Sequence, residues 1–190
     1  MAVFKSIHNA YKTILTNHPL KTQAVQAGAL MGFGDLISQA VIEKKPCDIE
    51  RTVRYGSVGL FIGPTLQTWF GLLEKRIGRG GFKKLVIKVT IDQCCFAPCF
   101  LAIVVSLVNT AQGKSLEETK NKLKTNYFDI LMANYMLWPW VQLTNFSIVP
   151  LAYRVPVVQM VAVSWNMYLS WKLNADKPSS SDELPVILPD

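Results

Sequence analysis

Four ionisable side chains stand inside long stretches of this sequence that otherwise carry almost no charge: Asp35, Lys88, Asp92 and Arg154. Arg154 is the clearest case, because it is the one charged residue between positions 138 and 171. An ionised side chain is costly inside a membrane, and it is kept there when a partner, water or a nearby interface receives it. We therefore predict that these four residues face the interior of a helix bundle, as pore-lining residues or intramembrane charges.

The four cysteines are the second group with reactive chemistry: Cys47, Cys94, Cys95 and Cys99. Their spacing does not match a zinc site, and three of them share one apolar segment, so they are either structural or redox-responsive. Cys99 is expected on the same helix face as Asp92, inside the bundle. Cys47 stands in a polar stretch and is expected to be more accessible. Cys99 and Cys47 are therefore the candidate redox residues.

Residue sets for catalysis are not found in the sequence. It has two histidines, both near the N-terminus, and it lacks a phosphate-binding glycine loop, an HExxH motif and a nucleophile elbow. We expect no enzyme activity, no cofactor and no metal site. The formal net charge of +7 arises largely from short Lys and Arg clusters that flank apolar segments, which is typical of membrane spans. Direct binding of nucleic acid is therefore not expected.

Long apolar stretches must position the four buried charges. A helix needs about 20 residues to cross the hydrocarbon core of a membrane. Four stretches meet that length, at residues 22–42, 52–73, 85–108 and 148–171. The expected fold is all-α, an integral membrane four-helix bundle within a single domain, residues 1–173. With four spans both termini lie on one side, and a small excess of Lys and Arg there favours the interior compartment.

The remaining segments flank this bundle. Residues 1–20 lack acids and carry apolar residues at helical spacing, which predicts a retained amphipathic helix at the membrane interface. Ser115 before two glutamates predicts a helix start. Residues 130–146 are apolar but rich in Trp and Tyr and interrupted by Pro139, which favours an interfacial or re-entrant segment over a fifth span. Residues 174–190 are expected to be disordered.

Small residues recur every four positions in the first two stretches, as Gly28 and Gly32 and as Gly59 and Gly63. Such spacing lets helix backbones approach closely within a membrane, so we predict that these glycines pack helices together. Polar residues follow similar stripes on all four stretches. Two interpretations remain open: the polar residues hydrogen-bond one another in a closed bundle, or they line a narrow aqueous path.

Depth along the helices predicts which charges pair. At 1.5 Å per residue, Asp35 and Arg154 lie at about the same level of the membrane, whereas Asp92 lies nearer the other side. Lys88 is one turn from Asp92 on the same helix. We therefore predict the pairs Asp35–Arg154 and Lys88–Asp92, with Arg54 as a competing partner for Asp35.

An ordered set of Trp, Pro, Asn and Gln residues near the C-terminus carries a resemblance to a known family: Trp138, Pro139, Gln142, Asn145, Phe146, Pro150, Trp165 and Asn166. The set resembles the signature of the Mpv-seventeen and peroxisomal membrane protein two family, and the likeness runs from about Tyr11 to Lys172. Gly34-Asp35, Gly63-Pro64 and Asp92-Gln93 resemble further elements of the family.

This resemblance implies a multi-pass protein of the mitochondrial inner membrane, with the peroxisomal membrane as the alternative location. It also implies a weakly selective channel for small solutes that supports mitochondrial homeostasis and, indirectly, the maintenance of mitochondrial DNA. The partners implied are the lipid bilayer and small solutes, and self-association into a homo-oligomer stays open. The alternative function is a non-conducting structural protein that stabilises an inner-membrane complex or the membrane architecture.

Overall fold

The computed structural model of this chain describes residues 2–174, and every regular element in that range is a helix. The predicted all-α class is thereby confirmed, while the predicted disordered tail lies almost wholly outside the described residues. In chain order the elements are α1 (Ala2–Asn17), α2 (Pro19–Ile37), the π-helical η1 (Ser38–Glu43), α3 (Ile49–Ile77), α4 (Phe82–Ile91), the π-helical η2 (Asp92–Phe96), α5 (Ala97–Ala111), α6 (Leu116–Ile148) and α7 (Leu151–Asn174).

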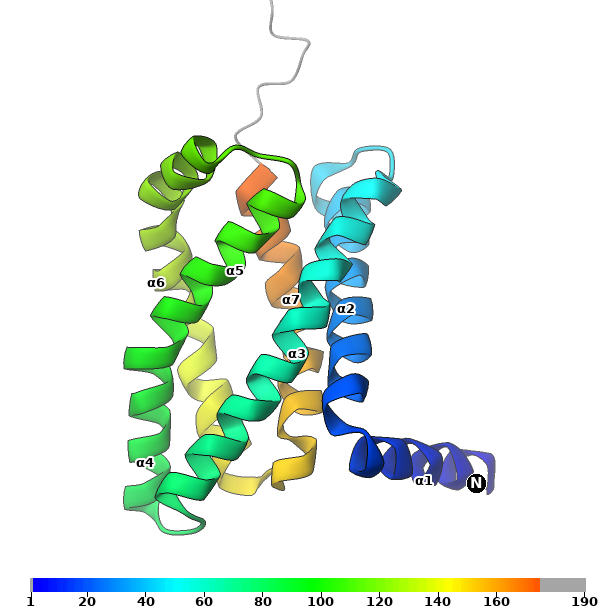
Figure 1. Ribbon diagram of the computed structural model, residues 1–190, viewed down its shortest axis with the longest axis vertical. Coiled ribbons are helices and arrows are strands. Elements are labelled where there is room, and N and C mark those ends of the chain that lie inside the picture. The colour runs from blue at the N-terminus through cyan, green and yellow to red at the C-terminus, as the bar shows by residue number, and fades with distance from the viewer. Residues whose placement is uncertain (1, 175–190) are drawn as a thin grey trace, which may run out of the picture.

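The helices form a bundle of five long rods, and α1 extends sideways from one end of it (Figure 1). The rods are α2 with η1, then α3, then α4 with η2 and α5, then α6, then α7. We call the end where η1 meets α3 the upper end, and the end where α3 meets α4 the lower end. Because the number of rods is odd, α2 begins at the lower end and α7 finishes at the upper end (Figure 1). The expectation that both ends of the bundle share one side is therefore wrong.

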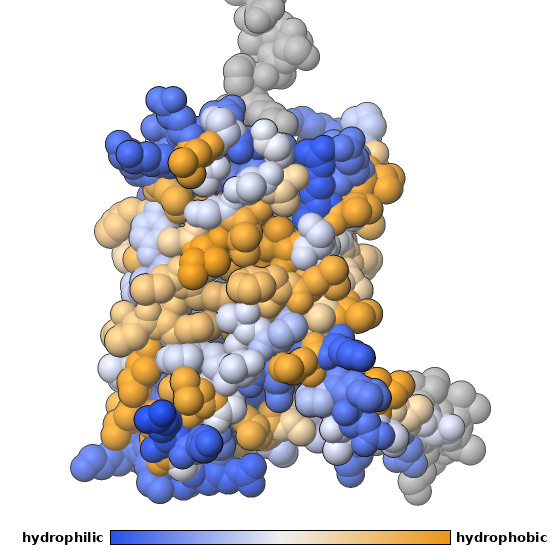
Figure 2. Space-filling view, in the orientation of Figure 1, coloured by the Kyte–Doolittle hydropathy of each residue, from blue (hydrophilic) through white to orange (hydrophobic). Residues whose placement is uncertain are grey.

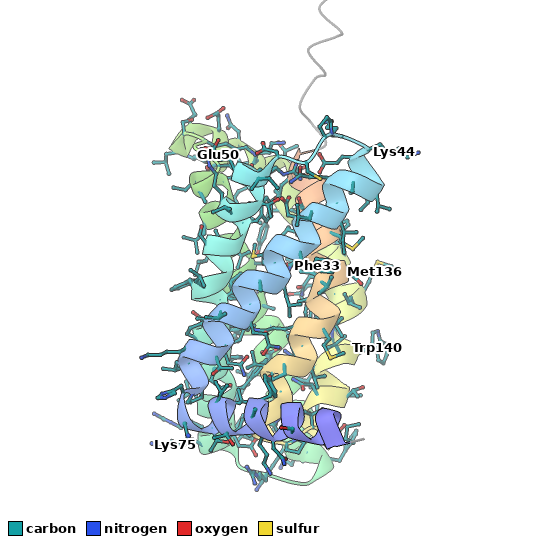
Figure 3. All side chains as sticks on the ribbon, turned by 90° about the vertical axis from the view of Figure 1, so that its right-hand side faces the viewer. Phe33, Lys44, Glu50, Lys75, Met136 and Trp140 are labelled. Atoms are coloured by element: carbon teal, nitrogen blue, oxygen red, sulfur yellow. The ribbon has the colours of Figure 1, made fainter. Side chains whose placement is uncertain are left out.

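Residues 130–146 differ most from expectation. They do not form a separate re-entrant segment but are part of a longer helix. They belong to α6, which continues through Pro139 for 33 residues, or about 50 Å at 1.5 Å per residue. Met136 and Trp140 of this stretch are exposed and project away from the bundle (Figure 3). These two apolar side chains therefore lie on the outer face of α6.

Local chemistry sets where the helices begin and end. Ser115 forms a capping box with Glu118: the serine hydroxyl accepts from the Glu118 N–H, and the Glu118 carboxylate accepts from the Ser115 N–H at 2.7 Å. That second bond lowers the pKa of Glu118. Gly78 ends α3 with a φ of 81°, a backbone conformation that residues other than glycine rarely adopt. The predicted helix start at Ser115 is confirmed.

The π-helical turn η2 follows from a proline. The Ala97 N–H bonds back five residues to the Asp92 carbonyl, but Pro98 has no N–H to offer the Gln93 carbonyl. The hydroxyl of Tyr135 on α6 donates to that carbonyl at 3.2 Å. A π turn holds more residues than an α turn, so it rotates every later residue of the rod relative to Asp92.

Glycines bring α2 and α3 into backbone contact. A Cβ added at Gly63 would lie 2.0 Å from the Gln23 carbonyl oxygen, and one at Gly59 would lie 2.6 Å from the Ala27 carbonyl oxygen. A Cβ at Gly28 would lie 3.0 Å from the backbone of α3. Gly59 and Gly63 therefore hold the two helices closer together than any side chain would allow, and Gly28 adds a third tight contact.

Other glycines meet different surroundings. A Cβ at Gly32 would make ordinary contact with Thr52 at 3.5 Å, so this position does not require glycine. Gly34 packs against α7, where an added Cβ would lie 2.9 Å from the Cβ of Asn166. Nothing lies within 4 Å of a Cβ placed at Gly71. The small-residue stripe therefore contains both tight and open positions.

The outside of the bundle suits a bilayer. A band of apolar side chains covers the middle of the face in Figure 2, and hydrophilic side chains gather at both ends. Two helical stretches among the described residues, Pro19–Glu43 and Phe82–Ala111, are long and apolar enough on their own to cross a membrane. The other rods carry more polar residues, many of which are buried inside the bundle.

Candidate functional site

The first of two buried charge clusters lies at the upper end, and we call it the upper network: Asp35, Glu43 and Arg51. Arg51 Nε donates to Asp35 Oδ1 at 2.9 Å. The two terminal nitrogens of Arg51 donate to the Glu43 carboxylate at 2.9 and 2.5 Å. One guanidinium thus bridges two buried carboxylates, which compensates part of their desolvation cost.

Neutral donors complete the shell of Asp35. The Ser170 hydroxyl donates to Oδ1 at 2.6 Å, while the Gln39 amide and the Thr52 hydroxyl donate to Oδ2 at 2.7 and 2.8 Å. Each carboxylate oxygen therefore has at least two donors. Because these partners come from α2, η1, α3 and α7, the upper network holds three rods together at one end.

The second cluster lies at the lower end, and we call it the lower network: Glu74, Arg79, Lys88 and Arg154. Lys88 Nζ and an Arg154 terminal nitrogen both donate to Glu74 Oε2 at 2.7 Å, and Arg79 Nε donates to Oε1 at 2.9 Å. Glu74, Lys88 and Arg154 are buried, whereas Arg79 is exposed. One acid is therefore shared by two buried cations from α4 and α7.

The predicted pair Asp35–Arg154 is wrong. Asp35 pairs with Arg51 at the upper end, and Arg154 pairs with Glu74 at the lower end. Arg54, the predicted competitor for Asp35, forms a surface pair with Glu50 one turn away. The four-span depth calculation fails because α6 adds a fifth rod, so α7 begins at the lower end and not at the upper end as four spans would require (Figure 1).

The predicted pair Lys88–Asp92 is also wrong, although both residues are buried on one rod. Lys88 reaches across to Glu74. The expected spans ended at residues 42 and 73, just before Glu43 and Glu74, but α3 continues to Ile77 and η1 continues to Glu43. A signal for Glu74 exists in the sequence, because it lies on the helical stripe that continues from Gly63 and Gln67 in steps of three and four.

A cavity occupies the centre of the bundle between the two networks. Its volume is about 120 Å³, which is space for several water molecules or one compact organic molecule. Side chains from α2, α3, η2, α5, α6 and α7 line it. Its polar lining consists of Asp92, Gln93, Asn134, Gln142, Gln159 and Asn166, and its aromatic lining of Phe96, Phe100, Trp138 and Trp165.

Asp92 is the one charged residue that lines this cavity among the described residues. Its Oδ1 accepts from the Trp69 indole N–H at 2.7 Å, and its Oδ2 accepts from the Gln93 amide at 2.7 Å. No described cation lies within ion-pair distance of this carboxyl group, in contrast to the carboxylates of both networks. Asp92 therefore has hydrogen bonds but no buried counter-charge.

Several amides around the cavity have unused hydrogen-bonding capacity. Within the described residues, Gln93 Oε1, Gln159 Oε1 and Asn134 Nδ2 are buried and have no protein partner. An unpaired buried polar atom costs about 1–3 kcal/mol, so water or a solute in the cavity would stabilise these groups. These amides were not predicted as site residues from the sequence, although Gln93 belongs to the Asp92-Gln93 element that resembles the family.

The four cysteines are free and exposed. Cys99 does not share the inward face with Asp92 as predicted, because the π turn η2 lies between them and shifts the rod's outward face toward the cysteines. Phe96 takes the inward place instead and lines the cavity. An interior position for the Cys99 thiol is therefore wrong, and its redox role stays a prediction, as does that of Cys47.

The signature residues near the C-terminus divide between two places. Trp138, Gln142, Trp165 and Asn166 line the cavity, and the two indole rings meet edge to face with centroids 6.0 Å apart. The other members lie near the α6–α7 turn or within α6: Pro139, Asn145, Phe146 and Pro150. Phe146 packs beneath the Arg154 guanidinium at 5.2 Å. The signature therefore describes the wall of the cavity and the support of the lower network.

Known proteins resemble this chain over most of its length. The sequence profile described as the Mpv17 / PMP22 family matches residues 109–170. The chain is 44% identical over 169 residues to "Mitochondrial inner membrane protein Mpv17" of Xenopus laevis, covering 87% of this chain and 96% of that protein. The chain belongs to the Mpv17 / PMP22 family. The resemblance stated from the signature residues is thereby confirmed.

Other members of the Mpv17 / PMP22 family match over the same length. The Homo sapiens protein of that name is 43% identical over 171 residues, covering 88% of this chain and 97% of its own length. "Protein sym-1" of Neurospora crassa is 39% identical over 169 residues, covering 85% and 95%. No solved structure matches the chain at a significant level. The names of the relatives and the apolar helices confirm the predicted location, the mitochondrial inner membrane.

Proposed function

We propose that this protein is a weakly selective channel for small solutes in the mitochondrial inner membrane. Through that activity it supports mitochondrial homeostasis and, indirectly, the maintenance of mitochondrial DNA. Its partners are the lipid bilayer and the solutes, homo-oligomers remain compatible with the exposed apolar surface, and neither catalysis nor direct nucleic-acid binding is part of the proposal.

In this proposal all five rods cross the membrane, and α1 lies along the lower interface. By composition alone, α3 and α6 are not apolar enough to be recognised as membrane spans, but they are 29 and 33 residues long. At 1.5 Å per residue each exceeds the hydrocarbon thickness of about 30 Å. Their inward polar residues are protected from lipid by the neighbouring rods.

The observation that carries the proposal is the central cavity with unpartnered amides. A closed bundle that serves as structure alone gains nothing from buried Gln93, Asn134 and Gln159 atoms that lack partners. A path for solutes uses such groups, because they replace the hydrogen bonds of water along the way. In this interpretation the upper and lower networks are the constrictions at its two ends.

A second function, a non-conducting structural protein, is favoured by those same networks. The upper network ties α2, η1, α3 and α7 together, and the lower network ties α3, α4 and α7 together. Cross-links at both ends suit a rigid element that stabilises an inner-membrane complex. This alternative leaves the cavity without a function.

Reconstitution of the purified protein in planar lipid bilayers separates the two functions. Discrete conductance steps are the expected result for the channel. A silent membrane, together with a stable complex that co-purifies from mitochondria, would instead support the structural role.

A further inference from the structure

Asp92 occupies an electrostatically unusual place in the cavity. It is buried and surrounded by neutral donors, and the nearest cation along its helix, Lys88, is engaged with Glu74. Arg154, the other buried cation at that end, is engaged with the same glutamate. A carboxylate in a membrane interior without a cation is costly, so a positive charge that enters the cavity is strongly favoured beside Asp92.

Two side-chain oxygens next to Asp92 need hydrogen-bond donors. The Gln93 amide N–H donates to Asp92 and the Gln159 amide N–H donates to the Gln23 carbonyl, while Oε1 of each residue is buried and has no donor. The cavity lining also holds N–H groups, on the amides of Asn134, Gln142 and Asn166 and on the indoles of Trp138 and Trp165. A ligand with N–H donors beside Gln93 and Gln159 would satisfy the two oxygens.

The rest of the wall is flat and apolar. Phe96 stacks between Trp69 and Phe100, with ring centroids 4.3 and 4.8 Å away, and Trp138 meets Trp165 on the opposite rods. Aromatic faces attract cations and also bind flat apolar groups. The cavity thus combines one acid, two side-chain oxygens without donors, and aromatic walls.

We propose that the central cavity is a binding site for a small organic cation, with its charged N–H groups against Asp92, Gln93 and Gln159 and its flat apolar body against the aromatic side chains. This inference names the solute class of the proposed channel and rests on that function. The ligand chemistry follows from the two oxygens without donors together with the acid that has no counter-charge, since a neutral apolar molecule would satisfy neither.

Benzamidine is a suitable probe, because it joins an amidinium to a flat ring, and benzamide and benzoate are its neutral and anionic counterparts. Calorimetric titration of the purified protein in detergent should show benzamidine binding at least about tenfold more tightly than benzamide, with no binding of benzoate. Equal binding of the three molecules, or a preference for benzoate, would overturn the proposal.

Variants locate the site. Asp92→Asn should remove the preference for benzamidine over benzamide, and Glu50→Gln, which alters an exposed acid, should leave it unchanged. If Asp92→Asn does not fold, Ala162→Trp provides the test, because Ala162 lines the cavity and the larger side chain would fill it. Wild-type affinity for benzamidine in the Ala162→Trp protein would place binding elsewhere and refute the proposal.

Conductance measured with the same probe distinguishes this inference from the channel itself. Benzamidine that binds and reduces the conductance supports both. A conducting protein that neither binds benzamidine nor responds to it refutes the cation site and leaves the channel standing. Tight, Asp92-dependent binding in a silent membrane supports the site and contradicts the channel.

Discussion

The α2–α3 interface and the central cavity are built on opposite principles, although the same two helices contribute to both. At the interface, Gly59 and Gly63 bring backbones so close that no side chain would fit. One helix face away, α3 turns larger residues such as Ile62 and Leu66 toward open space lined by unpartnered amides. The bundle is therefore tightly packed along the α2–α3 interface, which we call the seam, and loosely packed at the cavity beside it. Mutations in the seam should mainly affect stability, and mutations in the cavity should mainly affect function.

The largest expected effect comes from filling the seam. Gly63→Leu would force a side chain onto the Gln23 carbonyl, which neither backbone can avoid, so we expect almost no folded protein. Gly71→Leu on the same helix is the matched control, because open space surrounds that position. Yield and thermal unfolding in detergent are the measurements. Equal yields from the two variants would remove the distinction between seam and open face.

The next largest effect concerns the upper network. Arg51→Gln removes the one guanidinium shared by Asp35 and Glu43, and an unpaired buried charge costs about 3–5 kcal/mol. We expect a large fall in the unfolding temperature, partly restored when Asp35→Asn is added. Failure of that second change to restore any stability would show that the pair does not carry the loss.

A smaller effect is expected at the lower network. Arg154→Gln leaves Glu74 with Lys88 and Arg79, so the loss should be about 1.5–3 kcal/mol, as for a hydrogen bond to a charged group. Adding Asp35→Asn should make the protein worse, since those two residues lie at opposite ends. Restoration by Asp35→Asn in thermal unfolding would contradict the observed pairing.

The smallest effect on stability should come from the cavity itself. Asn134→Leu replaces a buried amide whose nitrogen has no partner, so the free energy of unfolding should change by less than about 1 kcal/mol. Conductance, in contrast, should fall, because the polar lining is interrupted. A strongly destabilised protein, measured by thermal unfolding, would show that Asn134 holds the bundle together and would weaken the separation of roles.

The sequence predicted the parts of this arrangement that depend on helical periodicity. The close approach of helices at Gly59 and Gly63 follows from four-residue spacing, and the burial of Asp35 and Arg154 follows from the cost of charge in lipid. Membership of the family was also readable, because Trp, Pro and Asn recur at fixed offsets around Trp165.

The sequence did not predict the parts that depend on where helices end and how they are wound. The second expected span stopped at residue 73, just before Glu74, Lys75 and Arg76, yet α3 continues past all three. The π turn before Pro98 moves Cys99 to the outer face, and straight-helix periodicity has no means to anticipate that rotation. Pro139 likewise indicated a break where α6 continues.

Conductance of two tryptophan variants in planar lipid bilayers tests the central claim, that solutes pass through the cavity, most directly. Ala162 lines the cavity, whereas Ser164, two residues further along α7, is exposed on the outer face. We expect Ala162→Trp to abolish or sharply reduce the conductance steps and Ser164→Trp to keep them at wild-type size, with both proteins folded. Wild-type steps from the Ala162→Trp protein would contradict the account.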